Sequence, residues 1–143
     1  MDTRPIIEVE LTLLPEAEGG RATPPAFEGM TYRPHIVIGD PRKRVAEVGA
    51  DGVTLQERYL GVAFQAGPDT VTFAQPFRAE AVLVYFPDVD YAQVTPGASF
   101  TLREGSRIIG HGRVTGRRVH QDSRPDNNEL QRTRPAQATE PRR

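Results

Sequence analysis

Residues 100–112 read Phe-Thr-Leu-Arg-Glu-Gly-Ser-Arg-Ile-Ile-Gly-His-Gly and carry the clearest structural signal in this chain. Gly105-Ser106 lies between two strand-like runs, and a tight hairpin turn needs a positive φ, which glycine adopts without steric cost. We therefore expect two strands, 99–104 and 107–119, joined by this turn. Gly110 and Gly112 alternate within the second strand, so a backbone or a ligand can approach one of its faces closely.

Five further segments have strand patterns, at 6–14, 32–38, 53–64, 70–73 and 79–86. In the first, apolar residues recur at every second position from Val9 to Leu13, which is typical of a half-buried strand. The third holds one or two strands, with a short helical turn at 56–60 as the alternative. The last is nearly continuous in apolar residues, so we expect it at the centre of the sheet.

Turn residues separate these segments, among them the hairpin-type pair Asp51-Gly52. Short strands at regular spacing, together with 13 glycines and 13 prolines, predict an all-β fold. We expect a single closed or nearly closed antiparallel β-barrel. Periodicity does not separate a barrel from a sandwich, but closure favours the barrel because it removes exposed sheet edges.

Length and composition predict one domain followed by a tail. The 143 residues are enough for one domain, and we place the barrel at residues 1–120. Residues 121–143 contain Leu130 as their only large apolar residue. Such a segment cannot bury enough surface to offset the entropy lost on ordering, so we expect a disordered tail.

Charge and cysteine content exclude several classes of function. The formal net charge of −1 gives no global field to attract nucleic acid or an anionic membrane. The absence of cysteine excludes disulfides, thiol catalysis and thiolate metal sites. No apolar run approaches the roughly 20 residues that cross a bilayer, and Glu8 and Glu10 interrupt the N-terminal run, which is unlike a secretory signal. We expect a cytoplasmic protein with no membrane partner.

A second glycine motif lies near the N-terminus, where Glu18-Gly-Gly-Arg21 is followed by Tyr32-Arg-Pro34. Together with residues 100–112, this order resembles the C-terminal β-barrel, the third domain, of bacterial elongation factor Tu over about residues 6–119. Ser106 stands where that family has a second glycine, and the loop after Tyr32-Arg-Pro34 differs. The resemblance implies the barrel fold, here as a stand-alone protein without the GTPase domain.

The resemblance also implies an interaction role. In that family the barrel contacts the other two domains, the tRNA T-stem and the nucleotide-exchange partner. We therefore expect a non-catalytic module that docks on a protein, with a translation factor as the implied class; the alternative is an accessory protein that binds tRNA or rRNA. Two simpler interpretations of these residues are possible. The turn at Gly105 serves only the barrel fold, or the basic cluster at 42–44 is a solvated surface. The candidate contact residues are Arg103, Glu104, Gly105, Arg107, Arg42, Lys43 and Arg44.

Sequence motifs for catalysis are absent. The chain has no Gly-x-x-x-x-Gly-Lys-Ser/Thr loop, no Asn-Lys-x-Asp and no Gly-x-Ser-x-Gly elbow. His35, His111 and His120 have no metal-ligand partner at helical spacing. Asp88 and Asp90 form an i, i+2 pair beside a proline, and we interpret them as solvated rather than as an acid–base or Ca²⁺ pair. We therefore expect no enzyme activity, no catalytic residues, no cofactor and no metal site.

Overall fold

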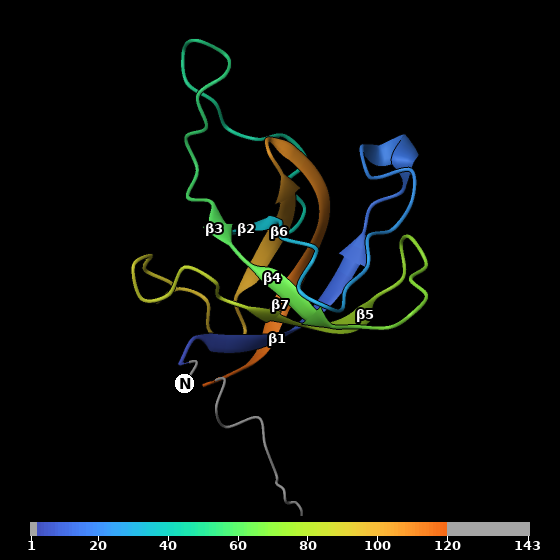
Figure 1. Ribbon diagram of the computed structural model, residues 1–143. Coiled ribbons are helices and arrows are strands. Elements are labelled where there is room, and N and C mark those ends of the chain that lie inside the picture. The colour runs from blue at the N-terminus through green and yellow to red at the C-terminus, as the bar shows by residue number, and fades with distance from the viewer. Residues whose placement is uncertain (1–2, 120–143) are drawn as a thin grey trace, which may run out of the picture.

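The structure, a computed structural model, describes residues 3–119 and shows one curled antiparallel β-sheet (Figure 1). The predicted all-β class is confirmed, since this part of the chain holds seven strands, one turn of 3-10 helix and no α-helix. The expected tail, residues 121–143, lies outside the described residues. The elements are β1 (Pro5–Leu13), η1 (Glu16–Glu18), β2 (His35–Ile38), β3 (Leu60–Gly61), β4 (Ala63–Ala66), β5 (Phe77–Val82), β6 (Ser99–Glu104) and β7 (Arg107–Val119).

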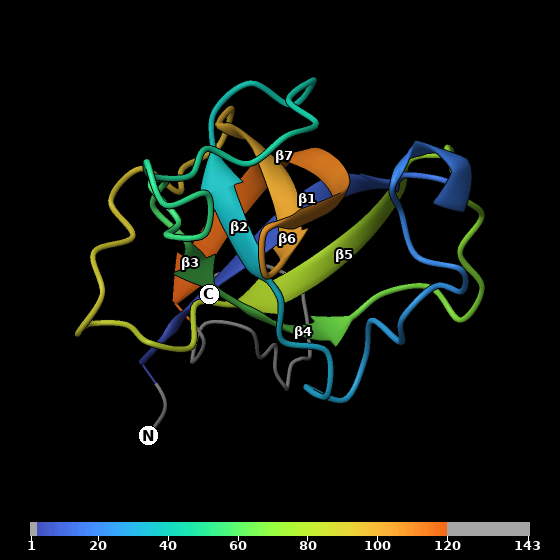
Figure 2. The same ribbon diagram turned by 90° about the horizontal axis from the view of Figure 1, so that it is seen from above.

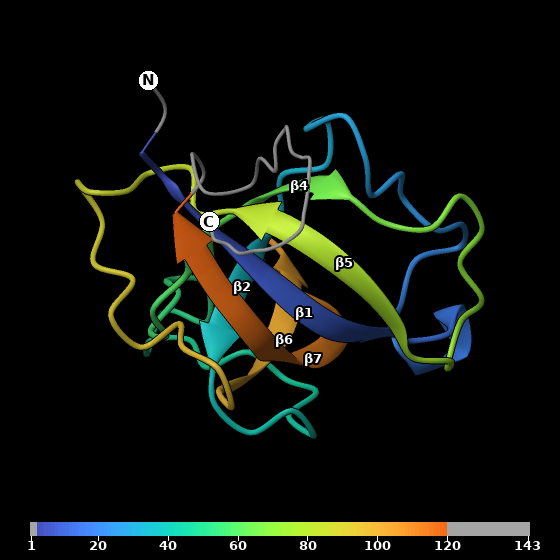
Figure 3. The same cartoon turned by 90° about the horizontal axis from the view of Figure 1, so that it is seen from below.

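The strand order is β3-β2-β6-β7-β1-β5-β4, and every neighbouring pair is antiparallel. Figures 2 and 3, seen from above and below, show how strongly the sheet rolls, with the long strands β1 and β7 side by side. The register shifts between Glu8 and Val9 in the β1–β7 ladder and between Leu102 and Arg103 in the β6–β7 ladder. Such bulges bend a strand and increase its local twist, which helps the sheet to curl.

The first strand has the predicted alternation. Val9, Leu11 and Leu13 are buried, while Glu8 is exposed. Because side chains point to opposite faces along a strand, this pattern places one face of β1 on the core and the other toward solvent. The strand prediction for residues 6–14 is confirmed.

The β6–β7 hairpin also forms as predicted, with Gly105 at a φ of +61°. At Gly112 an added Cβ would lie 2.3 Å from the Glu10 carbonyl oxygen and 3.0 Å from the Phe100 ring. The missing side chain therefore lets β1 and a core aromatic ring press against β7. Of the two expected roles for this glycine, the structure shows the close approach of a backbone.

The two outer strands of the sheet, β3 and β4, are separated in the chain only by Val62. β3 pairs with β2, and β4 pairs with β5. In addition, the Val62 amide donates to the Pro34 carbonyl at 3.1 Å, and the Phe64 amide donates to the Tyr32 carbonyl at 3.0 Å. Residues 60–66 thus hydrogen-bond with chain segments from both ends of the strand order.

The core fills the inside of the curl, and Phe27 ties the long loop before β2 to it. Its ring makes edge-on contacts with the rings of Tyr32, Phe64 and Phe77, at centroid distances of 5.5, 4.9 and 5.1 Å. Each such pair stabilises by about 0.5–1.5 kcal/mol beyond the burial of its surface. The loop that carries the first glycine motif is therefore a fixed part of the domain.

The strand predicted at 70–73 is wrong, because these residues lie in a loop. Val71 and Phe73 still pack against the core. Their apolar spacing reflects this packing rather than a strand, since four residues without a ladder partner gain little from an extended conformation.

The strand predicted at 79–86 is displaced. β5 begins earlier and ends at Val82, and it lies next to the outer strand β4 rather than at the centre of the sheet. After Val82 the chain turns, Leu83 is fully buried, and the Tyr85 ring lies over Gly61. The apolar run is continuous because these turn residues also cover core and sheet. Residues 56–60 form no helical turn.

Candidate interaction surface

The two glycine turns that carry the resemblance lie against each other. Arg107, just after the β6–β7 turn, donates from Nε to the Gly19 carbonyl at 3.0 Å and from Nη2 to the Gly20 carbonyl. Gly20 is itself required there, because an added Cβ would collide with the Leu14 carbonyl. Residues 87 positions apart in the chain are thus joined at one end of the molecule.

Glu104 fastens the same junction from the other side. Its carboxylate accepts hydrogen bonds from Arg21 Nη1 and from the Tyr32 hydroxyl, each at 2.7 Å. Burial raises the pKa of Tyr32, and the bond to the Glu104 carboxylate raises it further. The hydrogen bond to Glu104 also raises the pKa of Arg21. The Glu104 carboxylate is therefore bound by partners within the domain.

Arg103 points to the outer side of β6 and is fully buried, with 0% of its surface exposed. Nη1 and Nη2 donate to the two Glu57 carboxylate oxygens at 2.8 and 3.1 Å, while Nε donates to Thr101 Oγ1 and Nη1 also donates to the Tyr59 hydroxyl. Burial lowers the pKa of Arg103, but the bonds to Glu57 and Tyr59 outweigh it, so the pKa is raised. As placed, Arg103 is an internal anchor.

Glu57 shows the other half of this ion pair. The hydrogen bonds from Arg103 lower its pKa from 4.5 to about 2, against the opposing effect of burial. Lys43 adds a second cation, with Nζ 3.2 Å from Glu57 and also bonded to Glu47. Hydrogen bonds to these two glutamates raise the pKa of Lys43. The charges thus fix the loop between β2 and β3 to the outer face of the sheet.

Arg42 and Arg44 are the exposed members of the basic cluster. The Arg42 side chain is 88% exposed and pairs with Asp40 at 3.2 Å. Arg44 Nη1 donates to the carbonyls of Pro41 and Lys43 at 2.8 and 2.9 Å. Of the three predicted cluster residues, Arg44 is the one that forms no ion pair within residues 3–119.

Between these fixed points the loop projects as a hairpin arm, which we define as residues 44–56 (Figure 1). Val48 and Leu55 form an antiparallel bridge, and the Gly49 amide donates to the Thr54 carbonyl at 2.8 Å. At the tip the Asp51 carboxylate accepts from the Thr54 amide and hydroxyl. These bonds lower the pKa of Asp51 to about 2. The predicted turn at Asp51-Gly52 is confirmed.

Most of the exposed large apolar side chains in the described part of the chain lie on this arm. They are Val45 at 79% exposure, Val53 at 77%, Val48 at 40% and Leu55 at 39%, while Tyr85 and Val119 lie elsewhere. Sequence reasoning missed this surface because it assigned 53–64 to the sheet. The sequence held a signal for it, since four aliphatic residues flank the turn pair Asp51-Gly52.

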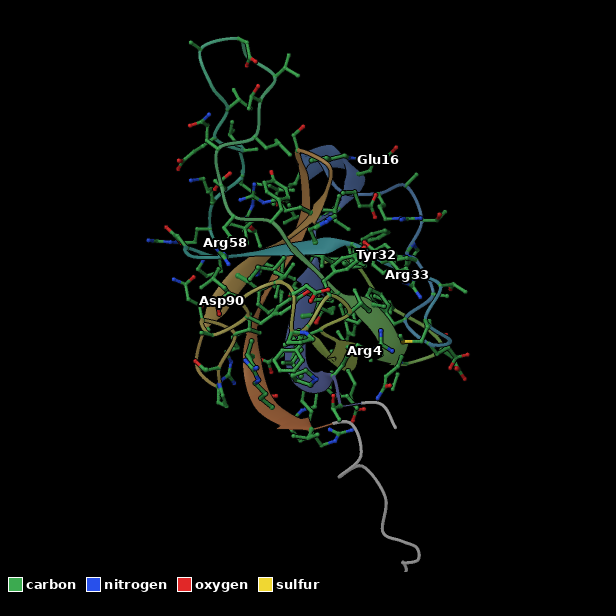
Figure 4. All side chains as sticks on the ribbon, turned by 60° about the vertical axis from the view of Figure 1, so that its left-hand side comes forward. Arg4, Glu16, Tyr32, Arg33, Arg58 and Asp90 are labelled. Atoms are coloured by element: carbon green, nitrogen blue, oxygen red, sulfur yellow. The ribbon has the colours of Figure 1, made fainter. Side chains whose placement is uncertain are left out.

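Asp90 and His111, which the sequence analysis considered as acid–base or metal-binding residues, lie outside the arm. The Asp90 carboxylate accepts from the Ala92 amide at 2.8 Å, and its carbonyl accepts from Arg58 at 3.2 Å (Figure 4). Burial lowers the pKa of His111, and the charge of Arg44 lowers it further. Among residues 3–119 no group of three His, Asp or Glu side chains is placed to hold a metal ion.

No protein-family model matches this chain, and no curated protein matches it. None of the described residues forms a helix with the length and hydropathy needed to cross a bilayer.

Proposed function

We propose that this chain is a non-catalytic binding module that docks on a protein partner through the arm. The observation that carries this proposal is the concentration of exposed Val45, Val48, Val53 and Leu55 on one projecting hairpin. Exposed apolar side chains that occur singly are normal on a protein, but a group of them marks interaction surfaces. An apolar centre with a polar rim is the usual composition of a protein interface.

The ion pairs at the base of the arm support the same proposal. Arg103 and Lys43 bind Glu57 at the base of the arm, so its position relative to the sheet is fixed before a partner arrives. A surface that is already ordered loses less conformational entropy on binding. Burying the Arg103 guanidinium costs desolvation free energy. This cost is explained if function requires the arm to stay in a fixed position.

The same proposal includes a closed barrel like the third domain of elongation factor Tu. Closure is supported by residues 60–66, which bond with chain segments at both ends of the strand order. The family resemblance is supported by the contact between the two glycine turns that define it, through Arg107 and the Gly19 and Gly20 carbonyls. A translation factor in the cytoplasm is then the partner class that this resemblance implies.

A second candidate function is binding of tRNA or rRNA. It is favoured by Arg42 and Arg44, which are exposed near each other at the base of the arm. Arg103 is buried in the ion pair with Glu57 and offers no surface contact as placed. RNA affinity would therefore depend on Arg42, Arg44 and the hairpin residue Arg107.

The test is a tagged pull-down from native lysate, with and without ribonuclease, using the full chain and two variants. The arm variant carries Val45→Ser and Val53→Ser, which change side chains that are 79% and 77% exposed and should leave the fold intact. The matched control is Val119→Ser, since Val119 is 38% exposed and lies at the end of β7 away from the arm (Figure 1).

We expect a protein that survives ribonuclease, is lost with the arm variant and is retained with the control. A protein retained by the arm variant would contradict docking through the arm. Recovery of tRNA or ribosomes that depends on Arg42 and is abolished by ribonuclease would replace the proposal with the RNA function.

A further inference from the structure

A groove with a volume of about 370 Å³ lies where the arm meets the two glycine turns. We call it the arm groove, and its principal residues are Glu18, Arg44, Val45, Val48, Arg107 and Ile108. Figure 1 shows the three contributing segments, η1, the β6–β7 turn and the arm, at the same end of the molecule. The volume is at the small end of the range of about 300–1,000 Å³ for ligand sites. It therefore fits a short segment rather than a domain.

Arg44 presents an unoccupied edge of its guanidinium. Nη1 is held by the carbonyls of Pro41 and Lys43, at 2.8 and 2.9 Å. No described residue accepts a hydrogen bond from Nε or Nη2 of Arg44. Those two groups form the edge that binds a carboxylate through two parallel hydrogen bonds.

Arg107, at the start of β7, contributes a second cation to the groove. Its Nε and Nη2 are bound to the Gly19 and Gly20 carbonyls, which fix the plane of the guanidinium. Those partners are neutral, and Arg107 forms no ion pair within the described chain. Its positive charge is therefore available to a ligand in the groove.

The rest of the groove is mainly aliphatic, with Glu18 as the one acidic residue among those that line it. Val45 and Val48 are exposed on the arm, and Ile108 is buried behind the turn at 4% exposure. Two cations against one anion leave a net charge of about +1 beside this apolar surface. A neutral or basic ligand would gain little from that arrangement.

We infer that the arm groove binds a short peptide segment of the partner in which a carboxylate side chain lies next to an apolar side chain. The carboxylate binds the Nε–Nη2 edge of Arg44, with Arg107 adding a favourable charge, and the apolar side chain packs on Val45 and Val48. This inference rests on the proposed function and specifies the chemistry of its partner.

The observations favour a peptide over RNA at this groove. Single-stranded RNA is held by rows of cations along its phosphates and by aromatic side chains that stack on its bases. No aromatic residue lines the arm groove. Nearby, Arg42 is paired with Asp40, and Lys43 is paired with Glu47 and Glu57. One open guanidinium edge beside aliphatic side chains matches a carboxylate in a peptide.

The test is a nuclear magnetic resonance titration of the ¹⁵N-labelled full chain with a blocked peptide, Gly-Glu-Leu-Glu-Leu-Gly. A twin peptide with glutamine in place of glutamate has the same shape without the charge. A uridine hexanucleotide serves as the RNA probe. We expect the glutamate peptide to shift the amide signals of residues 44–48 and 106–108, and to bind about tenfold more tightly than its twin, as for one charged contact.

Two charge variants give opposite expectations. Arg44→Gln should weaken binding of the glutamate peptide by about tenfold and leave the glutamine twin unchanged, since the lost contact is specific to the carboxylate. Glu18→Gln removes a like charge and should tighten binding of the glutamate peptide roughly twofold to threefold. Equal affinity for the two peptides, shifts outside the groove, or shifts produced only by the hexanucleotide would overturn the inference.

The pull-down described above separates this inference from the proposed function. If Arg44→Gln retains the partner while Val45→Ser with Val53→Ser loses it, the arm docks a protein and the carboxylate inference fails. If both variants retain the partner, docking through the arm fails as well. Loss of the partner with Arg44→Gln and also with the double valine variant supports both.

Discussion

Replacing Glu57 with glutamine should destabilise the domain strongly, although Glu57 lies in a loop. The change keeps the shape of the side chain and removes its charge. Arg103, with 0% exposure, would then remain buried without its carboxylate, since Lys43 is also positive. Removing one partner of a buried ion pair costs about 3–5 kcal/mol, because the other charge stays desolvated.

The lowered pKa of Glu57 corresponds to a cost of similar size. A pKa lowered from 4.5 to about 2 at Glu57 corresponds to about 3 kcal/mol of stabilisation at neutral pH. The Glu57 side chain is 10% exposed, so solvent screens part of the interaction. Glutamine also keeps one hydrogen-bonding oxygen for Arg103. We therefore expect a loss of about 2 kcal/mol in the free energy of unfolding.

Urea unfolding followed by far-ultraviolet circular dichroism measures this loss. With a denaturant slope of about 1–3 kcal/mol per molar, 2 kcal/mol lowers the urea midpoint by about 1 M at pH 7. The matched control is Glu47→Gln, because the Glu47 side chain is 63% exposed and should contribute less than about 0.5 kcal/mol. Equal midpoints for the two variants would refute the anchoring role of the ion pair.

The pH dependence gives an independent check. The pKa of Glu57 is lower in the folded chain than its ordinary value of 4.5. Its contribution is therefore complete above about pH 4.5 and is lost as the pH falls through about 2. The stability difference between the wild type and Glu57→Gln should shrink over that window. A difference that stays constant down to pH 2 would mean that the charge of Glu57 is not its cause.

Three further substitutions, together with Gly116→Ala as a control, test the fold around the hairpin. Gly112→Ala should cost about 2–3 kcal/mol in urea unfolding, because its Cβ would lie 2.3 Å from a β1 carbonyl oxygen; Gly116→Ala, whose nearest neighbour is a glutamate side chain at 3.4 Å, should change stability by less than about 0.5 kcal/mol. Tyr32→Phe removes the 2.7 Å bond to Glu104 and should lower the free energy of unfolding by about 1–2 kcal/mol, with an unchanged value contradicting the importance of the junction. Gly105→Ala, at a φ of +61° with no atom within 4 Å of the new Cβ, should cost about 1–2 kcal/mol from backbone strain alone.

Local patterns in the sequence predicted those parts of the fold that depend on neighbouring residues. The alternation from Val9 to Leu13 predicted β1, and the turn at Gly105 predicted the β6–β7 hairpin. Both formed as expected, because each pattern depends only on neighbouring residues. The prediction failed at 70–73 and at the end of 79–86. There, apolar residues pack on the core from loops, and a single sequence does not distinguish that burial from a strand.

The candidate contact residues could be predicted as charged groups, but their partners could not. Arg103 reads as a surface charge beside a turn, yet Glu57, 46 positions earlier, covers it. That pairing exists only because the loop between β2 and β3 folds back over β6. Ion pairs between distant segments follow from the arrangement of the strands, which spacing along the chain does not encode.

The fold also determines where an interaction surface remains. Charged side chains near the two glycine turns already have partners within the domain. Arg103 is paired with Glu57, and Glu104 accepts hydrogen bonds from Arg21 and Tyr32. Those pairs are structural, so a partner could recruit them only by breaking contacts that each stabilise the domain.

Arg44 and Arg107 differ from these residues because they donate only to carbonyl oxygens within the described chain. The same bonds fix their orientation without forming an ion pair, and both residues line one groove beside exposed valines. A carboxylate next to an aliphatic side chain satisfies both features at once. In the proposed function, the ion pair at Glu57 holds the arm in place, and the open edge of Arg44 binds the carboxylate of the partner.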